Sequence, residues 1–455
     1  MTTESHQYAT VKIKVVKASN YEDSSGKESQ LSALDMLMAP IRFQLCFFYS
    51  YKVQDQAIER ALVQLLNRYP EFSGRIQLSE SVVKLTNEGA QIVYLESAHV
   101  SISDLEASNF NYDLCAKHFN DDQPMDEYLL KIIVQPLSGG DGMMLSFGIH
   151  HCLCDINSAY LIIADFCAQV RESKFKFSEQ EIFRGSRLKH IRPSGNEPIF
   201  DHPEIRVIKS MEELKELGEA MRDDLLNEPP LILNFEVDYD SLKRIKRDVY
   251  AGGLEDGFKG SIKVSPSTND CLVSLIYKAF AETAIEDKEK NSENVFPFQL
   301  SVNSRFRRDP PVRREVLGNF ILLAVIDLSK EEATKLTSFE IACLMRSELL
   351  KMDEQYIQSS IDKIARNEFT QFTSFYHPTT MRFTNWNRYF DWYPDTDLGQ
   401  GRPEKFTTCS RMFEKYCIVK PARKEGDLDL TISLKTRHMQ QFLKHDIVKA
   451  YLKLL

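Results

Sequence analysis

The sequence lacks the long apolar runs that would place a chain in a membrane. No stretch of its 455 residues approaches the roughly 18 consecutive apolar residues that a membrane-spanning helix needs. The first residues, MTTESHQYATVKIKVV, contain no basic patch followed by an apolar run, so they do not resemble a secretory leader. We therefore expect a cytoplasmic protein without a membrane span.

Cysteine pairs and an excess of positive charge are also missing. The nine cysteines are an odd number without the paired spacing of a disulfide framework or a zinc site, so we expect reduced thiols and no bound metal. The formal net charge of −9 argues against nucleic acid as the main partner, because binding a phosphate backbone needs a basic surface. The sequence also has no glycine-rich phosphate loop, heptad or internal repeat.

The composition that is present is that of an ordinary globular protein. Hydrophobic residues make up 43% of the sequence and charged residues 27%, so the chain can bury a large core. Because single cores stop growing at roughly 250 to 300 residues, we expect two domains. A polar, proline-containing stretch that ends at Pro229 and Pro230 indicates a long connection. We predict an N-terminal domain at 1–195, a crossover linker at 196–230 and a C-terminal domain at 231–455, in a monomer.

Hydrophobic periodicity predicts that both halves mix helices and strands, which indicates the α/β class. In the first half, helical spacing covers 55–68 and the stretch from 156 to about 170, and strand patterns cover 129–135 and 143–149. In the second half we expect helices at 211–224, from about 269, at 338–355 and at 437–455, and strands at 296–303, 319–328, 415–420 and 428–435. The last strand alternates apolar with polar residues, which predicts one buried and one wetter face.

The strongest local signal is the segment FGIHHCLCDINSAY, in which His151 and Asp155 form an H-x-x-x-D element preceded by His150. It lies where a strand pattern changes to a helix pattern. One interpretation is structural, with Asp155 as the N-cap of the helix and both histidines as satisfied strand-end residues. The other is catalytic, because the pKa of histidine lies near neutral pH and suits the deprotonation of an acceptor hydroxyl. The element alone leaves both interpretations open.

Seven short segments, in order along the chain, resemble the signatures of one family. HHCLCD resembles the H-H-x-x-x-D-G element of the coenzyme A-dependent acyltransferase superfamily, with Ile156 in place of the usual glycine. The others resemble signatures of the plant and fungal BAHD acyltransferases: LSALD (31–35), YPEFSGR (69–75), STND (267–270), VNSRFRRDPP with GN (302–311 and 318–319), TNW (384–386) and DLGQGRP (397–403). The sequence is identified as a divergent member of this family.

Two departures from the family pattern lie in the DLGQG segment. Leu398 and Gln400 stand where the family usually has phenylalanine and tryptophan, and two extra residues separate TNW from this segment. In the family this loop is remote from the reacting atoms and has a structural role. The departures are therefore expected to change local packing rather than the reaction.

The resemblance implies two similarly built α/β domains of the chloramphenicol acetyltransferase type, each a mixed sheet flanked by helices, with a solvent channel between them. It implies that His151 is the general base and that Asp155 turns away from substrate to pair with Arg305 of VNSR. A buried charged pair of that kind is costly to break from one side, about 3 to 5 kcal/mol. Thr384 and Trp386 of TNW are expected to act on the oxyanion, although Trp386 can equally be a wall or core residue.

Coenzyme A is the expected co-substrate, and its phosphates need a local cluster of positive charge and free amides. The candidates are Lys259, Lys263, Ser267 and Thr268, at and before the start of a helix. The alternative is that both lysines are solvated and that Thr268 only caps the helix. A basic group at 307–314 adds a second candidate cluster.

Three functions compete. The first is an acyl-coenzyme A transferase that acts on a hydroxyl or amine of a small molecule of secondary metabolism, through a ternary complex. The second is a condensation-type enzyme that takes acyl groups from carrier proteins, and the third is a binding protein that has lost catalysis. We expect no covalent intermediate on Cys152 or Cys154, since the family uses none and these positions are variable there. The TNW and DLGQG segments argue against the second function, and the retention of key residues argues against the third: His151, Asp155, Arg305, Thr384 and Trp386.

Overall fold

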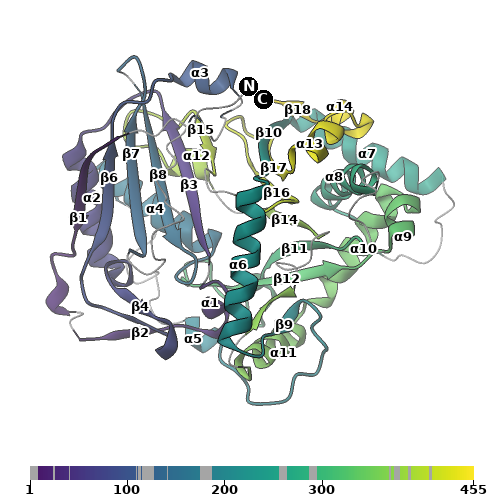
Figure 1. Ribbon diagram of the computed structural model, residues 1–455, viewed down its shortest axis with the longest axis horizontal. Coiled ribbons are helices and arrows are strands. Elements are labelled where there is room, and N and C mark those ends of the chain that lie inside the picture. The colour runs from purple at the N-terminus through teal and green to yellow at the C-terminus, as the bar shows by residue number, and fades with distance from the viewer. Residues whose placement is uncertain are drawn as a thin grey trace. The chain divides into compact units, whose positions relative to one another are not determined.

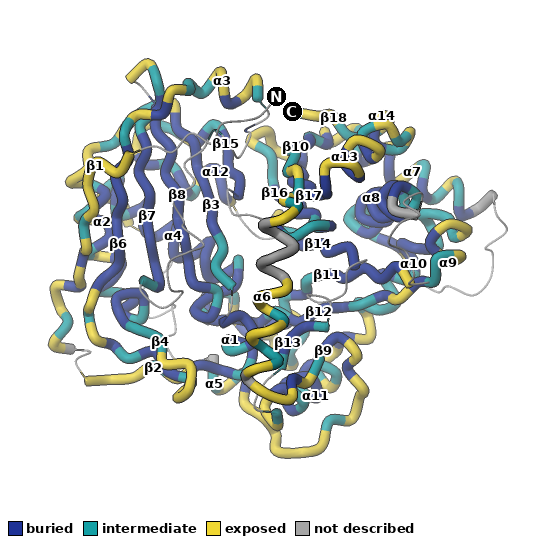
Figure 2. The backbone as a smooth tube through the Cα atoms, viewed as in Figure 1, coloured by how far each residue is buried: buried dark blue, intermediate teal, exposed yellow. Residues whose placement is uncertain are grey.

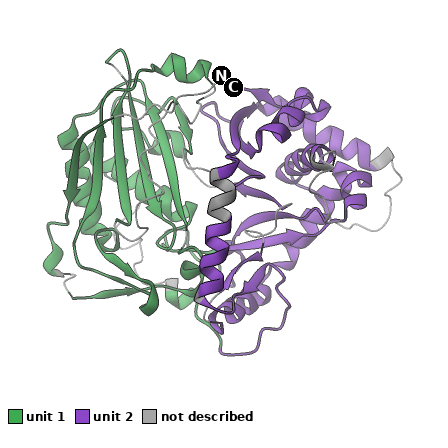
Figure 3. Cartoon of the chain, viewed as in Figure 1, with its two compact units in different colours: residues 1–194, 310–320, 389–411 green, residues 195–309, 321–388, 412–455 purple. Residues whose placement is uncertain are grey.

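The structure of the chain is a computed structural model that describes residues 9–23, 26–39, 41–108, 110, 114, 128–140, 142–174, 187–255, 264–285, 295–367, 370–373, 380–387, 391–408 and 412–455. The chain forms two compact units (Figure 3). Unit 1 contains residues 1–194, 310–320 and 389–411, and unit 2 contains residues 195–309, 321–388 and 412–455. None of the described helices is long and apolar enough to cross a membrane.

The two units differ from the continuous stretches expected from the sequence, because the second half of the chain contributes to both. The segments 310–320 and 389–411 lie in unit 1, so the DLGQG segment lies there as well. Residues 196–230, expected as a linker, lie in unit 2. Short segments that join a distant sheet carry no periodicity of their own, and the sequence pattern therefore does not assign them.

Unit 1 is built around a mixed six-stranded sheet (Figure 1). Its spatial order is β1 (Thr10–Val16), β6 (Ala90–Leu95), β7 (Leu130–Pro136), β8 (Met143–His150), β3 (Arg42–Tyr49) and β15 (Lys405–Thr407). A smaller sheet has the order β2 (Glu28–Gln30), β5 (Val82–Lys84) and β4 (Arg75–Gln77). The helices of unit 1 are α1 (Ala33–Leu37), α2 (Asp55–Arg68), α3 (Ile102–Ala107), α4 (Ile156–Val170), α5 (Arg187–His190) and α12 (Trp392–Asp395).

Both faces of the central strands of the unit 1 sheet are buried, as the dark strands of Figure 2 show, whereas the edge strand β1 is largely exposed. Helices α2 and α4 pack beside each other on one face, where Phe147 of β8 meets Phe166 of α4 with ring centroids 5.2 Å apart. An apolar cluster on the other face joins alternate residues of the strands to Leu105 of α3. The central strand β8 is consequently buried over its whole length, up to His150.

Unit 2 is built around a mixed seven-stranded sheet. Its order is β12 (Ile321–Ile326), β11 (Phe298–Asn303), β14 (Met381–Asn385), β16 (Tyr416–Pro421), β17 (Leu428–Leu434), β10 (Leu231–Val237) and β18 (Lys453–Leu454). The helices of unit 2 are α6 (Met211–Asn227), α7 (Tyr239–Glu255), α8 (Thr268–Ile285), α9 (Lys330–Lys335), α10 (Ser338–Lys351), α11 (Glu354–Ala365), α13 (Thr436–Phe442) and α14 (Asp446–Tyr451). Helix α8 packs against α7, α9, α10, α13 and α14.

Helices α2 and α4 have the predicted bounds, but two other predicted helices end early. The helix predicted at 338–355 is α10, which ends at Lys351, and α11 follows it after Asp353, which is extended and accepts a hydrogen bond on its side chain from the amide of Tyr356. The stretch 437–455 forms α13 and α14, with His445 as the cap of the second helix, and then ends in β18. An N-cap residue leaves helical geometry, so each of these caps starts a new helix.

The prediction of a wetter face on the last strand is wrong, because all seven residues of β17 are buried. One of its polar side chains bonds to those of both neighbouring strands. The Thr431 hydroxyl donates to Asn234 Oδ1 on β10 at 2.7 Å and accepts from Lys420 Nζ on β16 at 2.8 Å. Alternation therefore marks a polar row inside the protein here, in which Thr431, Asn234 and Lys420 bond to one another, whereas the buried Ser433 hydroxyl has no hydrogen-bond partner among the described residues.

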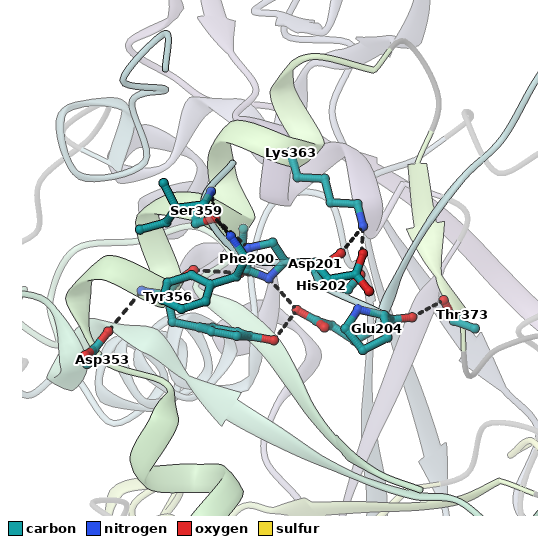
Figure 4. A network of polar contacts seen from close by, with 12 residues as sticks. Phe200, Asp201, His202, Glu204, Asp353, Tyr356, Ser359, Lys363 and Thr373 are labelled. Atoms are coloured by element: carbon teal, nitrogen blue, oxygen red, sulfur yellow. Dashed lines mark hydrogen bonds and ion pairs between the residues drawn. The ribbon is translucent and has the colours of Figure 1, made fainter. Parts of the chain in front are cut away.

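The first part of the expected linker is fixed to helix α11 (Figure 4). Strand β9 (Ile205–Val207) pairs with β13 (Thr370–Phe372). Lys363 of α11 donates to the carbonyl oxygen of His202 at 2.9 Å, and the Thr373 hydroxyl donates to the carbonyl oxygen of Pro203 at 2.8 Å. These contacts make the segment part of unit 2 rather than a free connection.

Candidate active site

His151 lies at the junction of β8 and α4, as the sequence predicts. Strand β8 ends at His150, which pairs in register with Arg42 of β3. The amide of His151 donates to the carbonyl oxygen of Ile41 at 2.9 Å, and helix α4 starts after Asp155. The His151 ring lies edge-on to Phe43, with centroids 4.9 Å apart. His151 is partly exposed, whereas His150 is buried.

The His151 imidazole is held by the side chain of Asn319. The Nδ1 atom of His151 lies 3.0 Å from Asn319 Oδ1. The Nδ2 atom of Asn319 donates to the backbone oxygen of His151 at 2.7 Å. Asn319 therefore binds both the ring and the backbone of one residue, which fixes the ring relative to β8.

Asn319 is held in turn by Asp35 of α1. The Oδ1 atom of Asp35 accepts from the backbone amide of Asn319 at 3.0 Å and from its Nδ2 atom at 2.9 Å. The Oδ2 atom accepts from the amide of Ser32 at 2.8 Å, and the Ser32 hydroxyl accepts from the amide of Asp35 at 3.2 Å, which is a capping box. Asp35 and Asn319 both have no exposed surface.

Asp155 fixes the other end of the histidine loop. Its Oδ1 atom accepts from the amide of Ser158 at 3.0 Å, which makes it the N-cap of α4. Its Oδ2 atom accepts from the amide of Phe320 at 3.1 Å. The Ser158 hydroxyl donates to the carbonyl oxygen of Gly318 at 3.0 Å. The histidine loop and the segment around Asn319 are thus bound to each other at His151 and again at Asp155 and Ser158.

The two histidines have different electrostatic environments. Burial lowers the pKa of His151, whereas the hydrogen bond to its own backbone, the charge of Asp155, the bond to Asn319 and the charge of Asp35 act in the opposite direction. Burial, the positive charge of Arg42 and the neighbouring His151 lower the pKa of His150 to about 3. His150 is therefore neutral at physiological pH and unsuited to exchanging protons, so His151 is the candidate base of the pair.

Asp35 and Asn319 both lie in sequence motifs, but the motifs do not indicate the hydrogen bonds that connect these two residues to His151. Asp35 closes LSALD and Asn319 closes GN, and they lie 284 positions apart in the chain. The available signal was the S-x-x-D spacing of a capping box at Ser32, which predicts a helix start but not a second use of the same carboxylate. No periodic pattern connects residues so far apart.

Thr384 and Trp386 lie at and just beyond the end of β14 in unit 2, and both are nearly buried. The amide of Trp386 donates to the carbonyl oxygen of Val419 at 2.7 Å, so the extended pairing continues to this residue. Asn385, between them, donates from Nδ2 to Asn269 Oδ1 of α8 at 2.6 Å. Because side chains alternate along a strand, Thr384 projects from the sheet face opposite to Asn385.

Of the expected coenzyme A residues, Lys259 and Lys263 lie outside the described residues. Ser267 precedes α8, and its hydroxyl accepts from the amide of Asp270 at 3.3 Å and from Arg346 Nη2 at 2.9 Å. Thr268 is the first residue of α8 and is partly exposed. Both hydroxyls thus lie at the start of α8, and that of Ser267 is bound by Asp270 and Arg346.

Arg305 is one of the largest fully buried side chains of the chain, which excludes a solvated surface charge. It lies in the 3₁₀ turn after β11, and its backbone amide donates to Asn303 Oδ1 at 3.1 Å. Neighbouring arginines of the expected basic cluster have other partners. Arg307 donates to the carbonyl oxygen of Met352 at 3.2 Å, and Arg308 pairs with Glu354 at 3.2 Å.

The DLGQG loop lies at the far end of the unit 1 sheet from His151. Tyr49, at the opposite end of β3 from Arg42, donates to the carbonyl oxygen of Thr396 at 2.8 Å. Arg171, just after α4, donates to the carbonyl oxygen of Asp397 at 2.6 Å. A strand of this length spans about 23 Å. The position of the loop agrees with a structural role.

Asp397 Oδ1 accepts from the amides of Gly399 at 2.6 Å and Gly401 at 3.1 Å, and these glycines have φ of +109° and +130°. Positive φ angles of this size explain why the two glycines of the segment are needed. Leu398 is buried, whereas the Gln400 side chain is exposed. The departures from the family pattern thus fall on one packing position and one surface position of the loop.

A second group in unit 2 has the arrangement of a serine nucleophile, a histidine and a carboxylate. His202 Nε2 lies 2.8 Å from Ser359 Oγ, and His202 Nδ1 lies 3.0 Å from Glu204 Oε1 (Figure 4). However, Ser359 Oγ already accepts from the amides of Ile199 at 2.9 Å and Phe200 at 3.2 Å, and Ser359 is only 3% exposed. A nucleophile needs a free lone pair and access for substrate, so this group is structural.

A cysteine nucleophile and a metal ion are two further chemistries that a site of this kind could use. Cys152 and Cys154, which flank the histidine loop, are both fully buried. Among the residues that the structure describes, no group of three histidine, cysteine, aspartate or glutamate side chains is placed to hold a metal ion.

Comparison with known proteins extends these local observations to the whole chain. A family model described as the Transferase family matches residues 9–447. Tryptamine hydroxycinnamoyltransferase 2 from Oryza sativa subsp. japonica is 24% identical over 437 residues, which cover 92% of this chain and 93% of that protein.

Two solved structures share the fold over almost the whole chain. Vinorine synthase superposes with a TM-score of 0.71 at 17% identity and covers 98% of this chain and 99% of its own. TRI101 from F. graminearum, in complex with coenzyme A and T-2 mycotoxin, superposes with a TM-score of 0.77 at 15% identity and covers 94% of this chain and 99% of its own. These likenesses confirm the expected two-domain α/β fold of the chloramphenicol acetyltransferase type. The chain therefore belongs to the Transferase family, as a divergent BAHD-type acyltransferase.

Proposed function

We propose that the protein transfers an acyl group from a coenzyme A thioester to a hydroxyl or amine of a small molecule, with His151 as the general base. The observation that carries the proposal is how the two nitrogens of the His151 ring are hydrogen-bonded. Its Nδ1 atom is held by Asn319, and no side chain of another described residue is hydrogen-bonded to Nε2. A partly exposed imidazole with one fixed and one available nitrogen is suited to remove a proton from an acceptor.

We propose that Asp155 holds the loop that carries His151 in position. Its carboxylate is 1% exposed and accepts two backbone hydrogen bonds, and we propose that it also pairs with the fully buried Arg305. A guanidinium without exposed surface needs an anionic partner, because an uncompensated buried charge is costly. In this role Asp155 positions the histidine loop and does not touch the substrate.

Attack on a thioester carbonyl creates an oxyanion, which needs a hydrogen-bond donor where the charge develops. We propose Thr384 for this task, with Trp386 beside it. Both residues are nearly buried and anchored by the pairing of β14 with β16. A donor on a rigid strand is already oriented before the reaction, which is the condition for such stabilisation.

The acyl donor is proposed from family membership and from the TRI101 complex, which contains coenzyme A. The start of α8, with Ser267 and Thr268, is the proposed contact for its phosphates, together with Lys259 and Lys263. The rice relative is named for transfer of a hydroxycinnamoyl group to tryptamine. An amine acceptor and an aromatic acyl group are therefore the first pair to assay.

The test is transfer from free coenzyme A thioesters by the purified protein and by His151→Ala. Loss of the base is expected to lower kcat by roughly 10²- to 10⁴-fold while the fold is retained, as judged by circular dichroism. Because both substrates must be bound together, double-reciprocal plots should intersect. Parallel lines, or a protein that gains the mass of one acyl group after exposure to the donor alone, would contradict the mechanism. Near wild-type turnover by His151→Ala would exclude His151 as the base.

A further inference from the structure

We infer that Asp35 and Asn319 are positioning residues that hold His151 in the tautomer with the proton on Nδ1, so that Nε2 is the nitrogen that acts as the base. The inference rests on the proposed function for its catalytic meaning, but the tautomer itself is a property of the free protein. It follows from the direction of four hydrogen bonds around one buried amide.

The first step is the orientation of the Asn319 amide. Its Nδ2 atom faces two oxygens that can only accept, the carboxylate of Asp35 at 2.9 Å and the backbone oxygen of His151 at 2.7 Å. Rotating the amide by half a turn would place Oδ1 against both of these oxygens, in a site without exposed surface. Two hydrogen bonds would become two repulsive contacts, so the observed orientation is the stable one.

The second step is the proton on the histidine. Since Oδ1 of Asn319 is an acceptor without a hydrogen, the 3.0 Å contact with His151 is a hydrogen bond only if Nδ1 carries the proton. The ring is also hydrogen-bonded to the backbone of His151 itself. A neutral imidazole with a protonated Nδ1 has its lone pair on Nε2.

The third step is the role of Asp35, which does not touch His151. Its Oδ1 atom accepts from both the backbone and the side chain of Asn319, so it fixes that residue in position and orientation. Its negative charge also raises the pKa of His151 against the effect of burial. When His151 takes a proton from the acceptor, the positive charge that develops is stabilised by this carboxylate through Asn319.

The experiment is a ¹H–¹⁵N correlation spectrum of the full chain labelled with ¹⁵N-histidine. Nitrogen chemical shifts distinguish a protonated from an unprotonated ring nitrogen and therefore report the tautomer without any substrate. The chain has 10 histidines, and the His151 signals are identified by their loss in His151→Gln. We expect Nδ1 protonated in the wild type, and a rise of the Nε2-protonated form in Asn319→Leu with a fall in kcat of about 10²-fold or more.

Two variants separate positioning from general stability. Asp35→Asn keeps an oxygen toward the two donors of Asn319 but removes the charge, so the tautomer should persist while the acid limb of kcat/KM moves to lower pH. Ser32→Ala breaks the capping box on the same carboxylate without touching Asn319. It should lower the melting temperature and leave both the tautomer and the acid limb unchanged.

Each outcome decides the inference. A wild-type His151 with the proton on Nε2 overturns it, and so does an Asn319→Leu variant that keeps both the tautomer and kcat. If Asn319→Leu does not fold, the wild-type spectrum and the acid limb of Asp35→Asn still decide. A wild-type protein with Nδ1 protonated that transfers no acyl group from any coenzyme A thioester would refute the proposed function and leave the tautomer assignment standing.

Discussion

At the scale of single residues, the burial of His151 determines the pH at which it acts. Burial is the largest influence on its pKa and lowers it from the ordinary value of 6.5. Since only the neutral ring accepts a proton, kcat/KM should be level above pH 6.5 and should fall only at lower pH. The pH profile of kcat/KM, measured with a non-titrating acceptor, checks this expectation.

His150 provides the matched control for that profile. Its pKa is lowered to about 3, so it stays neutral across the measured range and contributes nothing to the acid limb. His150→Asn should therefore leave the position of the limb unchanged. An acid limb centred at or above pH 6.5 in the wild type would show that the protein surroundings do not depress the pKa of His151.

Thr384 allows the oxyanion assignment to be tested at one atom. Thr384→Val preserves the shape of the side chain and removes the donor, so kcat should fall by about 10²- to 10³-fold with little change in melting temperature. Trp386→Phe is the companion variant, because it keeps most of the packing while it removes the indole donor. A Thr384→Val enzyme with full kcat would assign the oxyanion to another donor, such as a backbone amide.

The sequence predicted where individual candidate residues lie better than it predicted which residues they contact. His151 and Asp155 were located at the strand-to-helix junction because local patterns change there within a few residues. The sequence showed Asn319 and Asp35 only as members of two separate motifs. Their hydrogen bonds join three segments that are distant in the chain, around residues 35, 151 and 319. Hydrophobic periodicity describes which face of an element is buried and contains no information about such contacts.

At the scale of elements, the predicted helices with distinct local signals were confirmed. Helix α2 has the predicted bounds, and the chain leaves it at Tyr69 and Pro70. Helix α4 has the predicted bounds and the N-cap Asp155. The helix predicted at 338–355 was confirmed as α10 up to Lys351, whereas the helix predicted at 437–455 is interrupted where His445 caps α14.

The DLGQG loop gives a prediction about one element of unit 1. Gly401 has φ of +130°, a region that residues with a Cβ atom rarely adopt, and nothing surrounds the position where a Cβ would lie. Gly401→Ala should therefore destabilise the protein by backbone strain alone, by about 1 to 3 kcal/mol. Thermal or urea unfolding measures the loss.

The same variant tests the distance of this loop from the chemistry. Because the loop lies at the opposite end of the sheet from His151, kcat of folded Gly401→Ala should equal that of the wild type. Gln400→Ala, at an exposed position of the same loop, should change neither stability nor kcat by much. A large loss of kcat in folded Gly401→Ala would show that the loop takes part in the reaction.

At the scale of the whole molecule, the sequence predicted two domains with one main sheet each. It did not predict which short strands and segments of the second half belong to the first unit. Strand β15 is three residues long, and it pairs with β3 across more than 350 positions of sequence. Three residues carry too little pattern to be assigned to a sheet. The segment with Asn319 has the same property, because it belongs to unit 1 while its neighbours on both sides in the chain belong to unit 2.

This interleaving has a consequence for the order in which the protein is made. Synthesis proceeds from the N-terminus, and domains generally fold as they emerge from the ribosome. Here the histidine loop appears early, but Asn319 follows 168 residues later and β15 later still. The nascent first unit therefore has an open sheet edge and a His151 without Asn319 until these two segments have been translated. An exposed edge invites wrong strand pairing, so this interval is when the chain is most vulnerable to aggregation and most dependent on chaperones.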